Sequence, residues 1–163
     1  MKKVLVVMGS DSDLKVMEKC VDRLKSFGIP TEVRICSAHR TPAVAEQLAK
    51  NAAAEGFGVI IAAAGKAAHL GGVLAAYTTL PVIGVPMATS VMGGMDSLLS
   101  IVQMPKGIPV ATVAIDGADN AAILAAQMIA LSDEALAEKL AQFKADMAAE
   151  VTAKDEKVRA QFA

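Results

Sequence analysis

The chain has 163 residues, of which 16 are basic and 17 acidic, so its formal net charge is −1. A chain of this length predicts one domain that buries a core without help from disulfides or metals. The balanced charge, together with no Trp and a single Tyr, argues against nucleic-acid binding, and no polybasic stretch indicates a membrane surface.

The chain is apolar for its size, with 54% hydrophobic residues and a mean hydropathy of +0.46. No run reaches the roughly 18 apolar residues that a membrane-spanning helix needs. We therefore expect other copies of the chain to cover the surplus apolar surface in a homo-oligomer. Cys20 and Cys36 form no CxxC pair, and the apolar run near the N-terminus is too short for a secretion signal, so we expect a cytoplasmic protein.

The first half of the chain predicts three strands, each followed by a helix. Residues 4–8 form a continuous apolar run, which is typical of a buried parallel strand, and apolar residues at 14, 17, 21 and 24 have helical spacing. Residues 32–36 form the second predicted strand, and Pro42 opens a helix that ends near Gly56. Residues 59–64 form the third, followed by a glycine-rich segment and a short helix at 72–77.

The second half continues the alternation. It predicts a strand at 81–85, a loop rich in Gly, Ser and Thr, a helix at 96–102, a strand at 110–115, and helix from 120 onward with a restart at Ser132 and Asp133. This pattern predicts a single α/β domain over residues 1–163, with a charged helical tail at about 145–163. The sheet is predicted to be parallel, with helices on both faces.

Polar clusters follow the first three predicted strands. Such sheets bind ligands at the carboxyl ends of their strands, so we expect these clusters to meet. His39 and His69, the only histidines, lie in the second and third cluster, and histidine exchanges protons readily near neutral pH. At least one of them is expected to be functional, although a lone histidine is often only a hydrogen-bonded loop residue.

The residues beside His39 and those after the first strand suit a nucleotide. Arg40 offers the planar donors that bind phosphate, just ahead of a helix N-terminus, although an ordinary surface arginine fits the same loop. Ser10 can serve a phosphate, and the carboxylates of Asp11 and Asp13 suit ribose hydroxyls. The alternative for this segment is helix capping by Asp11 or Ser12.

Other chemistries lack their motifs. No GxGxxG follows the first strand, and the Gly65 and Lys66 pair is not a P-loop because Ala67 occupies the Ser/Thr position. The four candidate metal ligands, which are His39, His69, Asp11 and Asp13, have no ligand spacing on one element, so no metal is expected. Cys36 is more typical of a small buried side chain than of a nucleophile.

Taken together, the motifs resemble a known family. MGSDSD at 8–13, SAHRTP at 37–42, AAHL at 67–70, and DSLLSIVQMP at 96–105 followed by GIPV at 107–110 are similar to those of N5-carboxyaminoimidazole ribonucleotide mutases, the catalytic subunit of bacterial phosphoribosylaminoimidazole carboxylase. The resemblance runs from the first strand to about residue 131. It differs at Lys66, where the family often has Gly or Ala, and at Gly71, where it often has Pro.

The resemblance implies a flavodoxin-like three-layer sandwich, assembled as a homo-octamer, that needs no cofactor and no metal. It implies an isomerase of purine (IMP) biosynthesis, which moves a carboxyl group within one nucleotide through transient CO2. An ATP-dependent synthase would supply the N-carboxy substrate. His39 is the implied proton carrier. The implied substrate-binding residues are Ser10, Ser37 and Arg40 for the phosphate, Asp13 for the ribose with Asp11 nearby, and Gly65, Ala68, His69 and Leu70 for the base and CO2 pocket.

Two other functions remain open at this point. One is a carboxylase that adds free CO2 to aminoimidazole ribonucleotide, which the AAHL segment disfavours by resemblance alone. The other is a non-catalytic flavodoxin-like module that binds a nucleotide without turnover. A flavin carrier is disfavoured because the chain has few aromatic residues to stack on a flavin.

Overall fold

The computed structural model describes residues 1–163. Five parallel strands form one sheet in the order β2-β1-β3-β4-β5. The strands are β1 (Lys3–Met8), β2 (Thr31–Ile35), β3 (Phe57–Ala64), β4 (Val82–Pro86) and β5 (Ala111–Thr112). The chain places β2 on one side of β1 and β3 on the other, so the strand order switches at β1. This order is that of flavodoxin-like folds.

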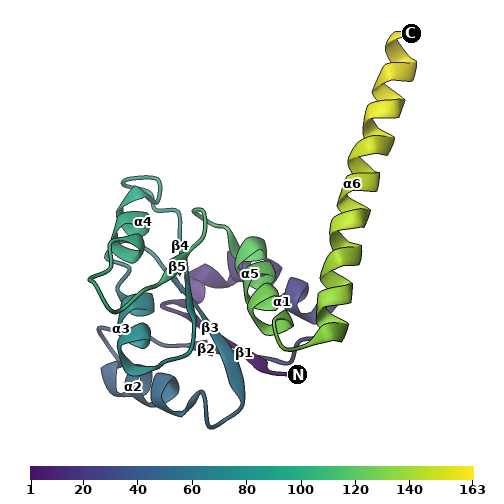
Figure 1. The fold of residues 1–163 in the computed structure, drawn as a ribbon. Helices are drawn as coiled ribbons and strands as arrows, with labels where there is room; N and C mark the ends of the chain where they lie inside the picture. The colour runs from purple at the N-terminus through teal and green to yellow at the C-terminus, as the bar shows by residue number, and fades with distance from the viewer.

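Helices cover both faces of the sheet (Figure 1). On one face α1 (Leu14–Ser26) packs against α5 (Ala118–Ala130). On the other face lie α2 (Pro42–Asn51), α3 (Leu70–Tyr77) and α4 (Met95–Val102). The predicted three-layer α/β sandwich is therefore confirmed.

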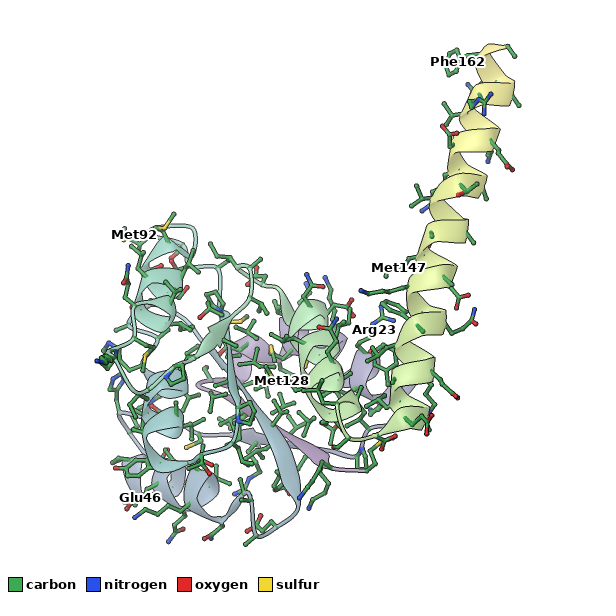
Figure 2. All side chains as sticks on the ribbon, in the orientation of Figure 1. Arg23, Glu46, Met92, Met128, Met147 and Phe162 are labelled. Carbon is green, nitrogen blue, oxygen red and sulfur yellow. The ribbon has the colours of Figure 1, made fainter.

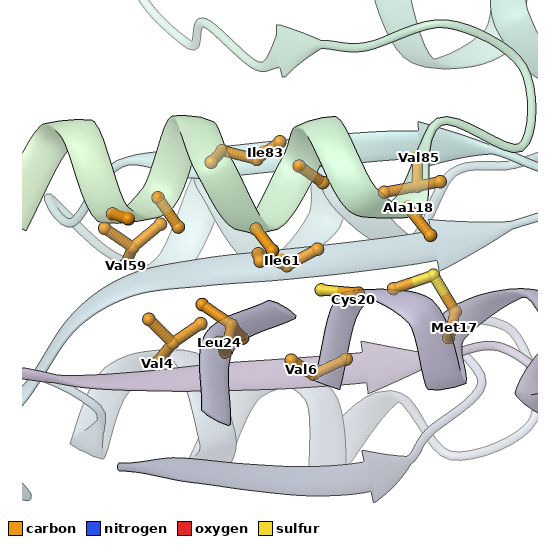
Figure 3. Packing of buried hydrophobic residues seen from close by; sticks show 14 of the residues in the cluster. Val4, Val6, Met17, Cys20, Leu24, Val59, Ile61, Ile83, Val85 and Ala118 are labelled. Carbon is orange, nitrogen blue, oxygen red and sulfur yellow. The ribbon is translucent and has the colours of Figure 1, made fainter. Parts of the chain in front are cut away.

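The core consists of two apolar clusters, one on each face of the sheet. Alternate residues of a strand point to opposite faces, so Val4 and Val6 join the cluster beneath α1 and α5, whereas Leu5 and Val7 join the cluster beneath α2 and α3. Figure 3 shows Val4 and Val6 facing Leu24 of α1. Burial on both faces explains why β1 is a continuous apolar run rather than an alternating one.

The long C-terminal helix α6 (Glu134–Phe162) is attached to the body only at its start. The Asp133 carboxylate caps it by accepting a hydrogen bond from the Leu136 amide at 3.1 Å, and Leu136 is fully buried. Phe143 packs edge-on against Phe27 with the ring centroids 5.5 Å apart. The Arg23 guanidinium lies 4.7 Å from the centre of the Phe143 ring, which strengthens this attachment.

Beyond this attachment α6 projects away from the domain (Figures 1 and 2). Met147, Val151, Val158 and Phe162 are all exposed along it. Their spacings of four, seven and four residues place them on one side of a helix. The projecting part of α6 therefore carries an apolar stripe with no partner in the chain.

The fifth strand is much shorter than predicted. Residues 110–115 are apolar enough for a full strand, but β5 consists only of Ala111 and Thr112, which pair with Ile83 and Gly84. Its neighbour β4 ends at Pro86, which has no N–H to donate to a ladder. The chain then turns at Asp116, whose φ is 56°.

Candidate active site

A cavity of about 630 Å³ opens at the carboxyl ends of β1, β2, β3 and β4, next to the switch in strand order. Four loops line it, one after each of the first four strands. These loops span residues 9–13, 37–40, 65–70 and 87–90, and all of their residues except Asp11 and Ala68 line the cavity. The cavity therefore lies where parallel sheets of this topology bind their ligands.

Most of the predicted site residues meet in this cavity. Those that line it are Ser10, Asp13, Ser37, His39, Arg40, Gly65, His69 and Leu70. Two others do not. Asp11 is exposed and lines a neighbouring cavity of about 490 Å³, together with Ser10 and Arg40. Ala68 is 1% exposed and packs in the apolar cluster beneath α2 and α3, so it supports the wall of the cavity without facing it.

The two histidines are in direct contact. Nε2 of His39 lies 2.9 Å from Nδ1 of His69, and the rings meet nearly at right angles, at 82°. Both side chains are exposed to the cavity. At this distance one ring nitrogen donates and the other accepts, so the two facing atoms hold one proton between them. The pair can thus give up or take on a proton at the cavity wall.

Arg40 and Ser37 form a cluster of donors that joins two loops. The Ser37 hydroxyl accepts hydrogen bonds from the Arg40 amide at 3.2 Å and from Arg40 Nε at 3.4 Å. Arg40 Nη2 donates to the carbonyl of Gly9 at 3.4 Å, which ties the loop after β2 to the loop after β1. The remaining guanidinium donors, with the hydroxyls of Ser37 and Ser10, suit a phosphate group.

Asp13 is the buried carboxyl of the cavity, at 8% exposed. Its place follows from a single 3₁₀ turn, η1 (Asp11–Asp13), in which the Ser10 hydroxyl accepts a hydrogen bond from the Ser12 amide at 3.3 Å. Ser10 thus caps this turn, and α1 follows Asp13 with no side-chain cap, so the alternative of helix capping by Asp11 or Ser12 is wrong. Burial raises the pKa of Asp13 above its usual value, although the Ser12 hydroxyl donates to the carboxylate at 3.4 Å.

The sequence interpretation did not assign the loop after β4 to the site. The cavity is also lined by Met87, Ala88, Thr89 and Ser90 of this loop. The loop is held at its base because Asp116 Oδ1 accepts a hydrogen bond from the Ala88 amide at 2.9 Å. Its position after a buried strand is the same signal that marked the other three loops, so the strand-end rule applied to β4 would have found it.

The structure contains neither a cluster of metal ligands nor a membrane-spanning helix. No group of three or more His, Cys, Asp or Glu side chains is arranged to hold a metal ion. No helix combines the length and the apolar character needed to cross a bilayer.

The chain is similar to known proteins over nearly its full length. The family model described as AIR carboxylase matches residues 3–150. The N5-carboxyaminoimidazole ribonucleotide mutase of Methanocaldococcus jannaschii is 54% identical over 159 residues, which cover 98% of this chain and 99% of the relative. The mutase of Thermotoga maritima is 52% identical over 158 residues, covering 97% and 92%.

A solved structure of similar fold agrees with these sequence matches. The crystal structure of PurE from Treponema denticola has a TM-score of 0.87 and 31% sequence identity, covering 94% of this chain and 96% of that one. Fold, sequence and the position of the cavity lead to the same conclusion: the chain belongs to the AIR carboxylase family.

Proposed function

We propose that the chain is an N5-carboxyaminoimidazole ribonucleotide mutase of de novo purine biosynthesis, active as a single domain over residues 1–163. It converts its substrate to 4-carboxy-5-aminoimidazole ribonucleotide by intramolecular carboxyl transfer. The observation that carries the proposal is the contact of His39 with His69 at 2.9 Å inside a cavity that also contains Arg40. The names of the curated relatives support the same reaction.

The nucleotide is held by groups on the first two loops. Arg40, Ser37 and Ser10 bind the phosphate, because their hydroxyl and guanidinium donors lie together at the carboxyl ends of β1 and β2. Asp13 accepts hydrogen bonds from the ribose hydroxyls, and Asp11 lies next to this position. The base then lies toward the loop at 65–70, close to the histidine pair.

The reaction needs only proton transfers and confinement of CO2. His39 donates a proton to the exocyclic nitrogen as the N–C bond of the carbamate breaks, and CO2 is released into the cavity. C4 of the aminoimidazole attacks the carbon of CO2, and the C4 proton passes to His39, which restores its starting state. Holding CO2 beside C4 makes its recapture effectively intramolecular, which is worth several powers of ten in rate. His69 lines the pocket and holds the His39 ring.

Two other functions fit less well. A carboxylase that uses free CO2 would share the cavity, but the curated relatives described above carry the mutase name. A nucleotide-binding module without turnover would have no use for two histidines that share a proton in the binding cavity.

We also propose a homo-octamer located in the cytoplasm, with transient CO2 as the only other small reactant and a functional link to the ATP-dependent synthase of the N-carboxy substrate. The apolar stripe on the projecting part of α6, from Met147 to Phe162, supports an oligomer because it lacks a partner in the chain. The free thiols of Cys20 and Cys36 fit a reducing compartment.

Light scattering tests the octamer. It should give eight times the mass of one 16.8 kDa chain, whereas a monomer mass would contradict the assembly.

A turnover assay without ATP and at low bicarbonate tests the activity. The N-carboxy nucleotide should yield the 4-carboxy product, whereas aminoimidazole ribonucleotide should not. Efficient product from aminoimidazole ribonucleotide plus bicarbonate, with no use of the N-carboxy nucleotide, would assign the chain to the carboxylases. No product from either nucleotide would leave the binding module.

A further inference from the structure

Lys66 has an unusual backbone conformation at the edge of the cavity. Its φ is 56°, and only one other non-glycine residue of the chain, Asp116, has a positive φ. A residue with a long side chain is uncommon in this left-handed region, where glycine is favoured. Strain of this kind persists where the surrounding structure holds it, and it gathers at functional sites.

The two strained residues differ in what their side chains do. The Asp116 carboxylate accepts a hydrogen bond from the Ala88 amide, so its side chain has a structural task. At Lys66 only the backbone is engaged: its carbonyl accepts hydrogen bonds from the Ala68 amide at 2.8 Å and from the Ser100 hydroxyl at 3.4 Å. Glycine would make the same two bonds without strain. The Lys66 side chain forms no ion pair and no hydrogen bond within the chain, although it lines the cavity.

Lys66 and Arg40 bring two cations to the cavity from different loops. Arg40 is tied to Ser37 and Gly9, on the loops assigned to the phosphate. Lys66 comes from the loop after β3, three residues before His69. The proposed substrate and product also carry two anionic groups, which are the phosphate and the migrating carboxylate.

We propose that the Lys66 ammonium group binds the migrating carboxylate, and that it thereby makes the site prefer carboxylated nucleotides to aminoimidazole ribonucleotide. This inference rests on the proposed function. A compact ammonium on a flexible stem suits this task, because the carboxylate moves from the exocyclic nitrogen to C4 and the cation can follow it. Lys66 is thus a binding and specificity residue, separate from the proton transfer assigned to His39.

The test is calorimetric binding of two ligands, the 4-carboxy product and aminoimidazole ribonucleotide, to the wild type and to Lys66→Met. A hydrogen bond to a charged group is worth enough to raise the Kd of the 4-carboxy product by about tenfold or more. The Kd of aminoimidazole ribonucleotide, which lacks the carboxylate, should change by less than about twofold. Lys66→Arg should restore product binding, and Lys66→Gly, which fits the backbone without strain, should repeat the loss seen with Met.

Lys106→Met is the matched control, because Lys106 lies in an exposed turn and lines none of the cavities described above. Equal weakening of both ligands by Lys66→Met would show that Lys66 contacts the phosphate, and unchanged binding of both would show that it contacts neither group. Either result overturns the inference while leaving the mutase reaction intact. A wild type that binds neither nucleotide would instead overturn the proposed function, and the inference with it.

Discussion

Replacing His39 with Asn separates proton transfer from nucleotide binding. Asparagine keeps a polar side chain of similar reach but cannot exchange a proton near neutral pH. In the proposed reaction His39 serves two proton transfers, one to nitrogen and one from C4. A general acid–base residue contributes roughly 10²- to 10⁴-fold to the rate, so kcat should fall by at least about 10²-fold.

Binding and stability should change little by comparison. The phosphate donors Ser37 and Arg40 bond to each other and to Gly9, not to His39. The Kd of the 4-carboxy product should therefore stay within about threefold of the wild-type value. The only side-chain hydrogen bond of His39 is the exposed contact with His69, so its loss should cost about 1 kcal/mol or less, or roughly 2–4 °C in Tm.

Stopped-flow turnover and calorimetric product binding on the same preparation measure both quantities. The matched variant is His69→Asn, which removes the partner ring and leaves the proton carrier, and it should retain more turnover than His39→Asn. Near-normal turnover in His39→Asn, or the reverse order of the two variants, would refute the assigned roles.

Three further predictions follow from burial. Burial raises the pKa of Asp13 above its ordinary 3.8, so the folded state holds this proton more tightly than the unfolded state and ionisation at pH 7 opposes folding. Asp13→Asn should then raise the free energy of unfolding at pH 7, with a gap that shrinks as the pH falls to 3.8, and should weaken nucleotide binding. Urea titrations at pH 7 and at pH 3.8 check this, and equal gaps between variant and wild type at the two pH values would contradict it. Burial also raises the pKa of Cys20 to about 12, so a thiol-exchange reagent at pH 8 should modify Cys20 only after unfolding. Peptide mass mapping distinguishes Cys20 from the second free thiol, Cys36, and rapid modification of Cys20 in the native protein would be the opposing result. Gly84→Ala places a methyl group against Cγ2 of the buried Ile101 and 3.1 Å from Val110 Cγ1, so it should destabilise the fold by about 1–3 kcal/mol. Ile101→Ala removes Cγ2, so in thermal denaturation Gly84→Ala should cost less in the Ile101→Ala background than in the wild type.

The sequence predicted the strands well where burial alone decides them. The runs at 4–8 and 59–64 are apolar throughout because helices cover both faces of the sheet, and both appear as β1 and β3. Burial does not decide the length of an edge strand. Residues 110–115 are apolar apart from Thr112, yet β5 stops at Thr112. Pro86 of β4 offers the following residues a carbonyl, which accepts from the Asp116 amide at 2.8 Å, but no N–H to donate.

The sequence predicted which loops form the site better than it predicted which side chains of those loops face the cavity. Strand ends located three of its four loops, but Asp11 and Asp13 look alike in sequence. The single 3₁₀ turn buries Asp13 in the cavity and leaves Asp11 exposed on its outer side. The contact between His39 and His69 joins residues 30 apart, and it depends on how the rings of two different loops are oriented. Sequence spacing carries no information on such an orientation.

The most direct test of the account is the fate of the migrating carbon. The N-carboxy nucleotide would be labelled with ¹³C in its carboxyl group, and turnover would proceed in a large excess of unlabelled bicarbonate. If CO2 stays beside C4 in the cavity between His39 and Lys66, the 4-carboxy product should keep the label, as read by mass spectrometry. A product whose carboxyl group matches the unlabelled bicarbonate pool would contradict carboxyl transfer within the cavity.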